Sequence, residues 1–215
     1  MNYTPATIII ALAFIIGIAY GGTLLSAIPS LKRSLFKTAP VSLLAISAWV
    51  SGAPVLLVIA LGLSAAGDAF LSKTGEKMFL AGLGSFLLAH LIYVALFINH
   101  PGDVQPTGLT LLAVAVVTIA LIALVLKSLW SHLGAMKIPV VFYTLIIGAM
   151  NMAAWHSGQT PFLLIAVALF VFSDMVLSHE LFVWQEPARK KLAAYTVWFS
   201  YLMAQTMITL SFISL

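Results

Sequence analysis

Long apolar stretches, cut by short groups of charged residues, glycines and prolines, are the feature that most limits how this chain can fold. A helix needs about 20 residues to cross a bilayer. The stretches predict eight membrane spans, at 6–28, 36–51, 54–72, 76–98, 107–128, 137–156, 160–182 and 190–214. Because the stretches are continuously apolar, and do not alternate with polar residues, we expect helices and not strands. Residues 1–215 are then a single transmembrane domain, an all-α bundle.

The second predicted span is the weakest of the eight. It is short and opens around Lys37 and Pro40, and only Ser51-Gly52-Ala53-Pro54 separates it from the third span. These two pieces could instead form one broken or re-entrant element.

The composition excludes several classes of protein. The chain is 62% hydrophobic and 7% charged, whereas a soluble domain is about 25% charged. There is no cysteine, which excludes disulfides, thiolate nucleophiles and cysteine-ligated metals. All ten basic residues fall in the connections or at the span ends that adjoin them, so no basic surface is left for a nucleic acid partner.

The basic residues also predict an orientation. They occupy only the first, third, fifth and seventh connections, as Lys32, Arg33, Lys37, Lys73, Lys77, Lys127, Lys137, Arg189, Lys190 and Lys191. The positive-inside rule therefore places these four connections in the cytoplasm and both termini outside. We expect a multi-pass protein of the bacterial inner membrane, whose oligomeric state the sequence does not predict.

A faint internal repeat is also present. The segments 68–72 and 174–178 both read Asp-x-x-Leu-Ser, and 86–90 parallels 201–205. These matches suggest two four-helix halves of the same orientation, a 4+4 arrangement.

Two acidic residues stand inside predicted spans. Asp68 and Asp174 each lie about 13–14 residues, or about 20 Å, from the outer ends of spans three and seven. A charged side chain in hydrocarbon costs about 2.5–3.5 kcal/mol, so both should face the bundle interior. In the plainest interpretation each Asp only bridges helices, with Lys73 beside Asp68. If the two converge, like-charge repulsion would leave one protonated and one ionised, able to donate one proton and accept another.

Other polar side chains accompany the two acids in the predicted spans. The candidates for binding a substrate are Lys37, His90, Tyr93, Tyr143, Asn151, Ser173, Tyr201 and Gln205. A lone membrane His or Gln more often joins helices than binds a ligand. The five histidines are scattered and no His-Glu-x-x-His occurs, so we expect neither a metal nor another cofactor.

In chain order, several short motifs resemble one family. They are Lys37-Thr38-Ala39-Pro40, Gly67-Asp68-x-x-Leu71, Gly82-Leu83-Gly84-Ser85-Phe86 with His90-x-x-Tyr93, Tyr143 with Met150, Phe172-Ser173-Asp174, and Ser200-Tyr201 with Gln205. Together they resemble the lysoplasmalogenase family of YhhN-type membrane proteins. Its members have eight helices and hydrolyse the vinyl ether of lysoplasmalogens to a fatty aldehyde and a glycerophospho-alcohol. The resemblance implies that Asp68 and Asp174 are the catalytic acids and that a lysophospholipid is the substrate.

That chemistry suits two neighbouring acids. A vinyl ether is protonated on carbon to an oxocarbenium ion, which water captures, so the enzyme needs a proton donor and an anion. We hypothesise that one Asp is the acid and the other the base, with Lys37 near the headgroup. A proton-coupled transporter and a zinc-dependent lipid hydrolase remain alternatives, whereas an intramembrane aspartyl protease fits poorly because its Gly-x-Gly-Asp reads Ala65-Ala66-Gly67-Asp68 here.

Overall fold

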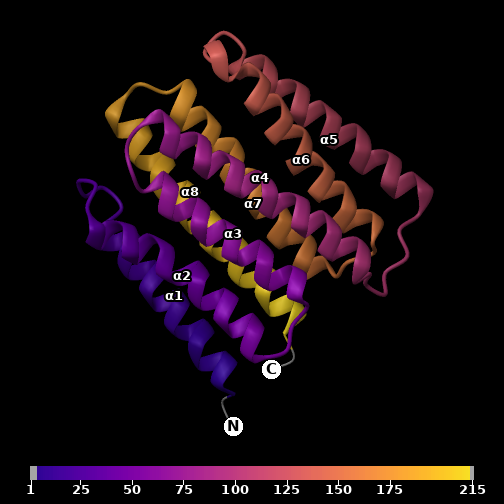
Figure 1. The fold of residues 1–215 in the computed structure, drawn as a ribbon. Helices are drawn as coiled ribbons and strands as arrows, with labels where there is room; N and C mark the ends of the chain where they lie inside the picture. Colours follow the sequence, from indigo (N-terminus) through magenta and orange to yellow (C-terminus); the bar gives the residue numbers. More distant parts are fainter. Residues whose placement is uncertain (1–3, 214–215) are drawn as a thin grey trace.

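A computed structural model describes residues 4–213 and shows an all-helical bundle in that range, with no β-strand (Figure 1). The helices are α1 (Pro5–Thr23), α2 (Leu31–Val50), α3 (Val55–Leu71), α4 (Glu76–Asn99), α5 (Gly108–Leu129), α6 (Lys137–His156), α7 (Pro161–Phe182) and α8 (Pro187–Phe212), with a 3-10 turn, η1 (Gly134–Met136), before α6. The predicted fold class is confirmed.

The helices pass up and down, so α1 begins and α8 ends at one end of the bundle (Figure 1). The α1–α2, α3–α4, α5–α6 and α7–α8 connections lie at the opposite end, called the basic end here because it carries the ten Lys and Arg residues. Five helices, α1, α4, α5, α6 and α7, are long and apolar enough to cross a membrane by length and composition. At 17 residues, α3 is about 26 Å long, close to the thickness of the hydrocarbon layer.

Two predicted boundaries were wrong. Helix α1 ends at Thr23, so the first span is shorter than 6–28 and the chain turns before Ser30. Helix α2 begins at Leu31, five residues before the predicted start, because the Ser30 hydroxyl accepts a hydrogen bond from the Arg33 N–H and caps the helix. Residue 214 of the eighth predicted span lies outside the described range.

The second and third spans are separate helices, not one re-entrant element. Helix α2 continues through Pro40 for its full 20 residues and ends at Val50. The chain then reverses at Gly52, whose φ of 69° is in the left-handed region that glycine tolerates, and α3 begins at Val55.

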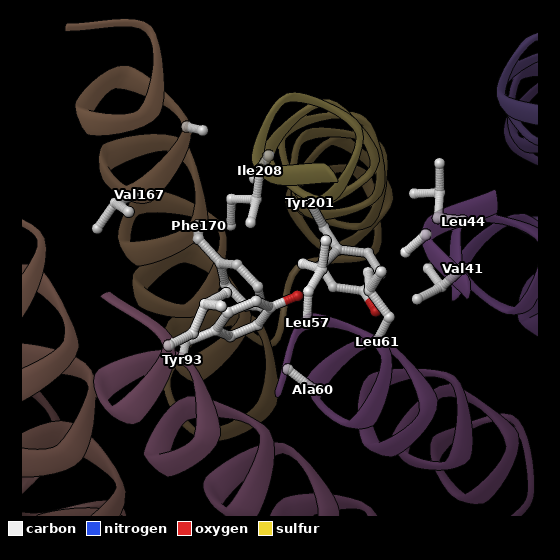
Figure 2. Close-up of a cluster of buried hydrophobic side chains, with 14 of the residues drawn as sticks. Val41, Leu44, Leu57, Ala60, Leu61, Tyr93, Val167, Phe170, Tyr201 and Ile208 are labelled. Atoms are coloured by element: carbon white, nitrogen blue, oxygen red, sulfur yellow. The ribbon is translucent and has the colours of Figure 1, made fainter. Parts of the chain in front are cut away.

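The main core lies where α2, α3, α4, α7 and α8 meet. Figure 2 shows Val41 and Leu44 of α2 on one side of Tyr201 and Phe170 and Tyr93 on its other side, with Leu57 and Leu61 of α3 next to the Tyr201 ring. Helix α5, by contrast, stands at the edge of the bundle, and only two of its residues, Thr118 and Leu129, are buried (Figure 1). The face of α5 that turns inward therefore meets a less densely filled part of the molecule.

Candidate active site

Asp68 lies in a buried cluster of side chains from three helices. It is 2% exposed, near the end of α3. Lys37 Nζ of α2 lies 3.5 Å from its Oδ1, and the Tyr201 hydroxyl of α8 donates to its Oδ2 at 2.9 Å. An ammonium group and a hydroxyl thus balance this carboxylate, as a buried acid requires. We call Lys37, Asp68 and Tyr201 the Asp68 cluster.

Asp174 lies in a second cluster, formed by α4, α6 and α7. The Tyr143 hydroxyl donates to Asp174 Oδ2 at 3.1 Å. His90 Nε2 lies 3.3 Å from the same oxygen but is not aligned for a hydrogen bond, so the contact is a close polar approach only. We call His90, Tyr143 and Asp174 the Asp174 cluster.

The backbone fixes the orientation of His90. Its Nδ1 lies 2.6 Å from the Phe86 carbonyl oxygen, one helical turn earlier on α4. A carbonyl can only accept, so Nδ1 carries a proton and the other ring nitrogen, Nε2, faces Asp174. His90 Nε2 and Asp174 Oδ2 are therefore polar atoms that face each other in this cluster, 3.3 Å apart.

The two acids do not share a hydrogen-bond or ion-pair partner among the described residues. Aromatic rings join the two clusters instead. The Phe170 ring lies edge-on to His90, with centroids 4.8 Å apart, and edge-on to Tyr201, at 5.5 Å. The structure therefore shows two adjacent acidic clusters.

A cavity of about 540 Å³ runs beside the Asp174 cluster. It lies among α4, α5, α6 and α7, with Leu71 of α3, and its wall is almost entirely apolar. Asp174 and Tyr143 belong to this wall, whereas Asp68 does not. Along α6 the wall extends from Val140 to Trp155, about 22 Å at 1.5 Å per residue. That length is most of the hydrocarbon thickness, and the volume is in the range of small-molecule sites.

The remaining predicted binding residues lie in different places. Asn151 is in the cavity wall, where its side-chain N–H donates to the Thr118 hydroxyl of α5 at 3.0 Å. The Tyr93 hydroxyl donates to Gln205 Oε1 at 2.6 Å in the core between α4 and α8. Ser173 donates to the Val197 carbonyl and so joins α7 to α8. The last two contacts join helices rather than line the cavity.

Two residues of the site carried little signal in the sequence. Thr118 is one of the few polar residues in α5, which could have indicated a polar neighbour, but Phe170 is one apolar residue among many. Within residues 4–213 there is no group of three His, Asp or Glu side chains that could hold a metal ion.

Fold and site together define a polytopic helical membrane protein in which a buried acid faces an apolar cavity of lipid length. Comparison with known proteins assigns it more narrowly. Residues 32–212 match the YhhN family, and the chain belongs to that family, as its motifs predicted.

Relatives in this family include proteins named lysoplasmalogenase. The chain is 32% identical over 160 residues to one from Mycobacterium tuberculosis, a match that covers 73% of this chain and 59% of the relative's length. It is 35% identical over 182 residues to lysoplasmalogenase TMEM86B of Homo sapiens, covering 83% of this chain and 74% of the relative. The corresponding protein of Rattus norvegicus is 32% identical over 187 residues, a match that covers 85% of this chain and 74% of the relative's length. No solved structure matches the chain.

Proposed function

We propose that this protein is a membrane-embedded hydrolase that cleaves the vinyl ether bond of lysoplasmalogen-type lysophospholipids. The observation that carries the proposal is the position of Asp174, a buried acid beside His90 in the wall of an apolar cavity. Family membership and the names of the relatives support the same substrate class.

The reaction consumes one water and balances without a cofactor. A proton is added to the outer vinyl carbon, and the positive charge moves to the carbon bonded to oxygen. Water adds to that carbon, and the hemiacetal then breaks its carbon–oxygen bond to give a fatty aldehyde and a glycerophospho-alcohol. The proton lost by the attacking water replaces the one first donated. The site must therefore supply a proton donor, an anion beside the cation and a dry slot for the chain.

We assign the proton donor to Asp174. In the proposed cycle Asp174 enters in its protonated form, with His90 Nε2 3.3 Å from its Oδ2 and the Tyr143 hydroxyl bonded to the same oxygen. After donation, the carboxylate is the anion beside the oxocarbenium ion and then accepts the proton from water. The apolar walls on α5, α6 and α7 exclude bulk water and hold the alkenyl chain.

We assign Asp68 a positioning role, which it exerts through neighbouring side chains. It holds the hydroxyl of Tyr201, whose ring lies 5.8 Å from that of Phe86 and 5.5 Å from that of Phe170. The Phe86 carbonyl and the Phe170 ring both contact His90. Asp68 thereby keeps His90 in register with Asp174.

The test is aldehyde release by purified Asp174→Asn, with Asp103→Asn as the matched control. Both changes remove one carboxylate, but Asp103 is exposed in the α4–α5 connection. We expect Asp174→Asn to lower the rate by about 10²–10⁴, the usual contribution of a general acid, and Asp103→Asn to keep wild-type activity. Full activity in a folded Asp174→Asn protein would overturn the proposal.

A further inference from the structure

Two buried hydrogen-bond donors near the basic end have no acceptor within the described part of the chain. Tyr20, in the last turn of α1, is 0% exposed, and its hydroxyl has no hydrogen-bond partner. Arg33, in the first turn of α2, has a buried Nε–H that is likewise unpaired. An unpaired buried donor costs about 1–3 kcal/mol, so two in one region indicate an acceptor that the chain itself does not provide.

Helix packing holds both donors toward the interior. Gly17 and Gly21 of α1 lie directly against α8, so that a Cβ on either would collide with an α8 side chain. Tyr20 lies between these two glycines in the sequence, and its ring is edge-on to that of Trp198 of α8, with centroids 4.5 Å apart. On α2, Arg33 is one turn before Lys37, on the same stripe as the buried residues Pro40, Val41 and Leu44.

Both positive and negative side chains lie near the two donors. Arg33 and Lys37 carry two positive charges on the inner side of α2, and the nearby carboxylate of Asp68 is 3.5 Å from Lys37. The charges of both Arg33 and Asp68 act on the Tyr20 hydroxyl. Arg33 Nη2 donates to the Leu25 carbonyl, at 3.4 Å. The two donors without a partner in the described part of the chain, Arg33 Nε and the Tyr20 hydroxyl, therefore favour a ligand with several oxygen acceptors.

We propose that Tyr20 and Arg33, with Lys37 beside them, bind the phosphate of a phospholipid headgroup. A phosphate diester carries one negative charge and several acceptor oxygens, and arginine binds such groups in a forked geometry. The last turn of α1 and the first turn of α2 lie at the basic end of the bundle, and the end of a membrane-spanning helix is where lipid headgroups are met. This site goes beyond the proposed hydrolysis, because it binds a phosphate whether or not the lipid carries a vinyl ether.

The test measures binding without turnover, on the purified full chain in a phosphate-free non-ionic detergent. The probe is a 1-O-alkyl lysophosphatidylethanolamine, whose saturated ether has no vinyl bond to hydrolyse, and the comparison ligand is the 1-O-alkylglycerol of the same chain length. We expect the phospholipid to bind more tightly. We expect Arg33→Gln and Tyr20→Phe each to weaken its binding by about ten- to hundredfold, the loss of a hydrogen bond to a charged group.

The matched control is Lys32→Gln, which removes the same charge from an exposed position one residue earlier; it should bind as the wild type does. Tyr20→Phe keeps the ring, and Arg33→Lys keeps the charge, so folded variants are available. Inorganic phosphate that competes at millimolar concentration would support the anion site and identify free phosphate as a second ligand. Unchanged phospholipid binding in both Arg33→Gln and Tyr20→Phe, or equally tight binding of the alkylglycerol, would overturn the proposal.

Discussion

At the scale of single residues, the Asp68 cluster depends on an internal ion pair. Replacing Asp68 by Asn leaves the Lys37 ammonium, 3.5 Å away, without its counter-ion in a partly buried position, where the Lys37 side chain is 16% exposed. We expect Asp68→Asn to lower the thermal unfolding temperature in detergent and to reduce aldehyde release.

The double variant Asp68→Asn with Lys37→Met separates these effects. It removes the unpaired charge, so it should recover part of the lost unfolding temperature while activity stays low. An Asp68→Asn protein as stable as the wild type would show that the ion pair contributes little to the fold.

The hydroxyl of Tyr143 gives a second prediction at this scale. Tyr143→Phe removes only the hydrogen bond to Asp174 Oδ2. Because that bond orients the proton donor, we expect kcat to fall about tenfold, equivalent to about 1.4 kcal/mol, with little change in KM. Steady-state kinetics would measure both constants. Tyr195→Phe, the same chemical change on a different helix, α8, is the control. A rise in KM alone would instead assign Tyr143 to binding.

The sequence identified the acids but not their partners. Asp68 and Asp174 stand out because charged residues are rare in apolar spans. Their contacts depend on the rotation of each helix about its axis, which hydropathy does not determine. For the same reason Tyr20 could not be distinguished from an ordinary aromatic residue near a membrane interface.

At the scale of helices, close packing of α3 against α4 positions the site. A Cβ on Gly67 would lie 2.6 Å from the Phe86 ring, whereas one on Gly62 of the same helix meets nothing within 4 Å. We expect Gly67→Ala to destabilise the protein by about 1–3 kcal/mol, the usual effect of overpacking. It should also lower activity, because Phe86 accepts the His90 hydrogen bond.

Gly62→Ala is the control for that prediction, since it adds the same methyl group on the exposed face of α3. Its unfolding temperature should equal or exceed that of the wild type. Equal unfolding temperatures and activities for the two variants would contradict the tight α3–α4 contact.

Hydropathy predicted the existence of the helices better than their ends. The Ser30 cap starts α2 within a polar segment, and a search for apolar stretches does not detect a helix start there. The chain likewise leaves α1 after Thr23 although residues 24 and 25 are still leucine. End positions depend on caps and turns, which apolar periodicity does not report.

At the scale of the whole molecule, the partners of the acids follow the 4+4 arrangement suggested by the sequence. Asp68 contacts Lys37 of α2 and Tyr201 of α8. Asp174 contacts Tyr143 of α6 and His90 of α4. Helices α2 and α6 correspond in such a repeat, as do α8 and α4. The repeat could not predict which acid faces a cavity, because that depends on how loosely α5 packs.

The orientation of the bundle is a separate prediction. The absence of native cysteine makes single engineered cysteines clean probes. We expect Asp103→Cys, opposite the basic end, to react with a membrane-impermeant thiol reagent on intact bacterial cells. Lys73→Cys, in the exposed α3–α4 turn, should react only after the membrane is broken. The reverse labelling pattern would place the basic end outside.

Vinyl ether hydrolysis is tested most directly by product analysis on two lysophospholipids with the same headgroup and chain length. One carries its chain through a vinyl ether and the other through an ester. The purified wild-type protein should release fatty aldehyde from the first and no fatty acid from the second. Fatty acid from the ester without aldehyde from the vinyl ether, or no product from either lipid, would contradict the proposed activity.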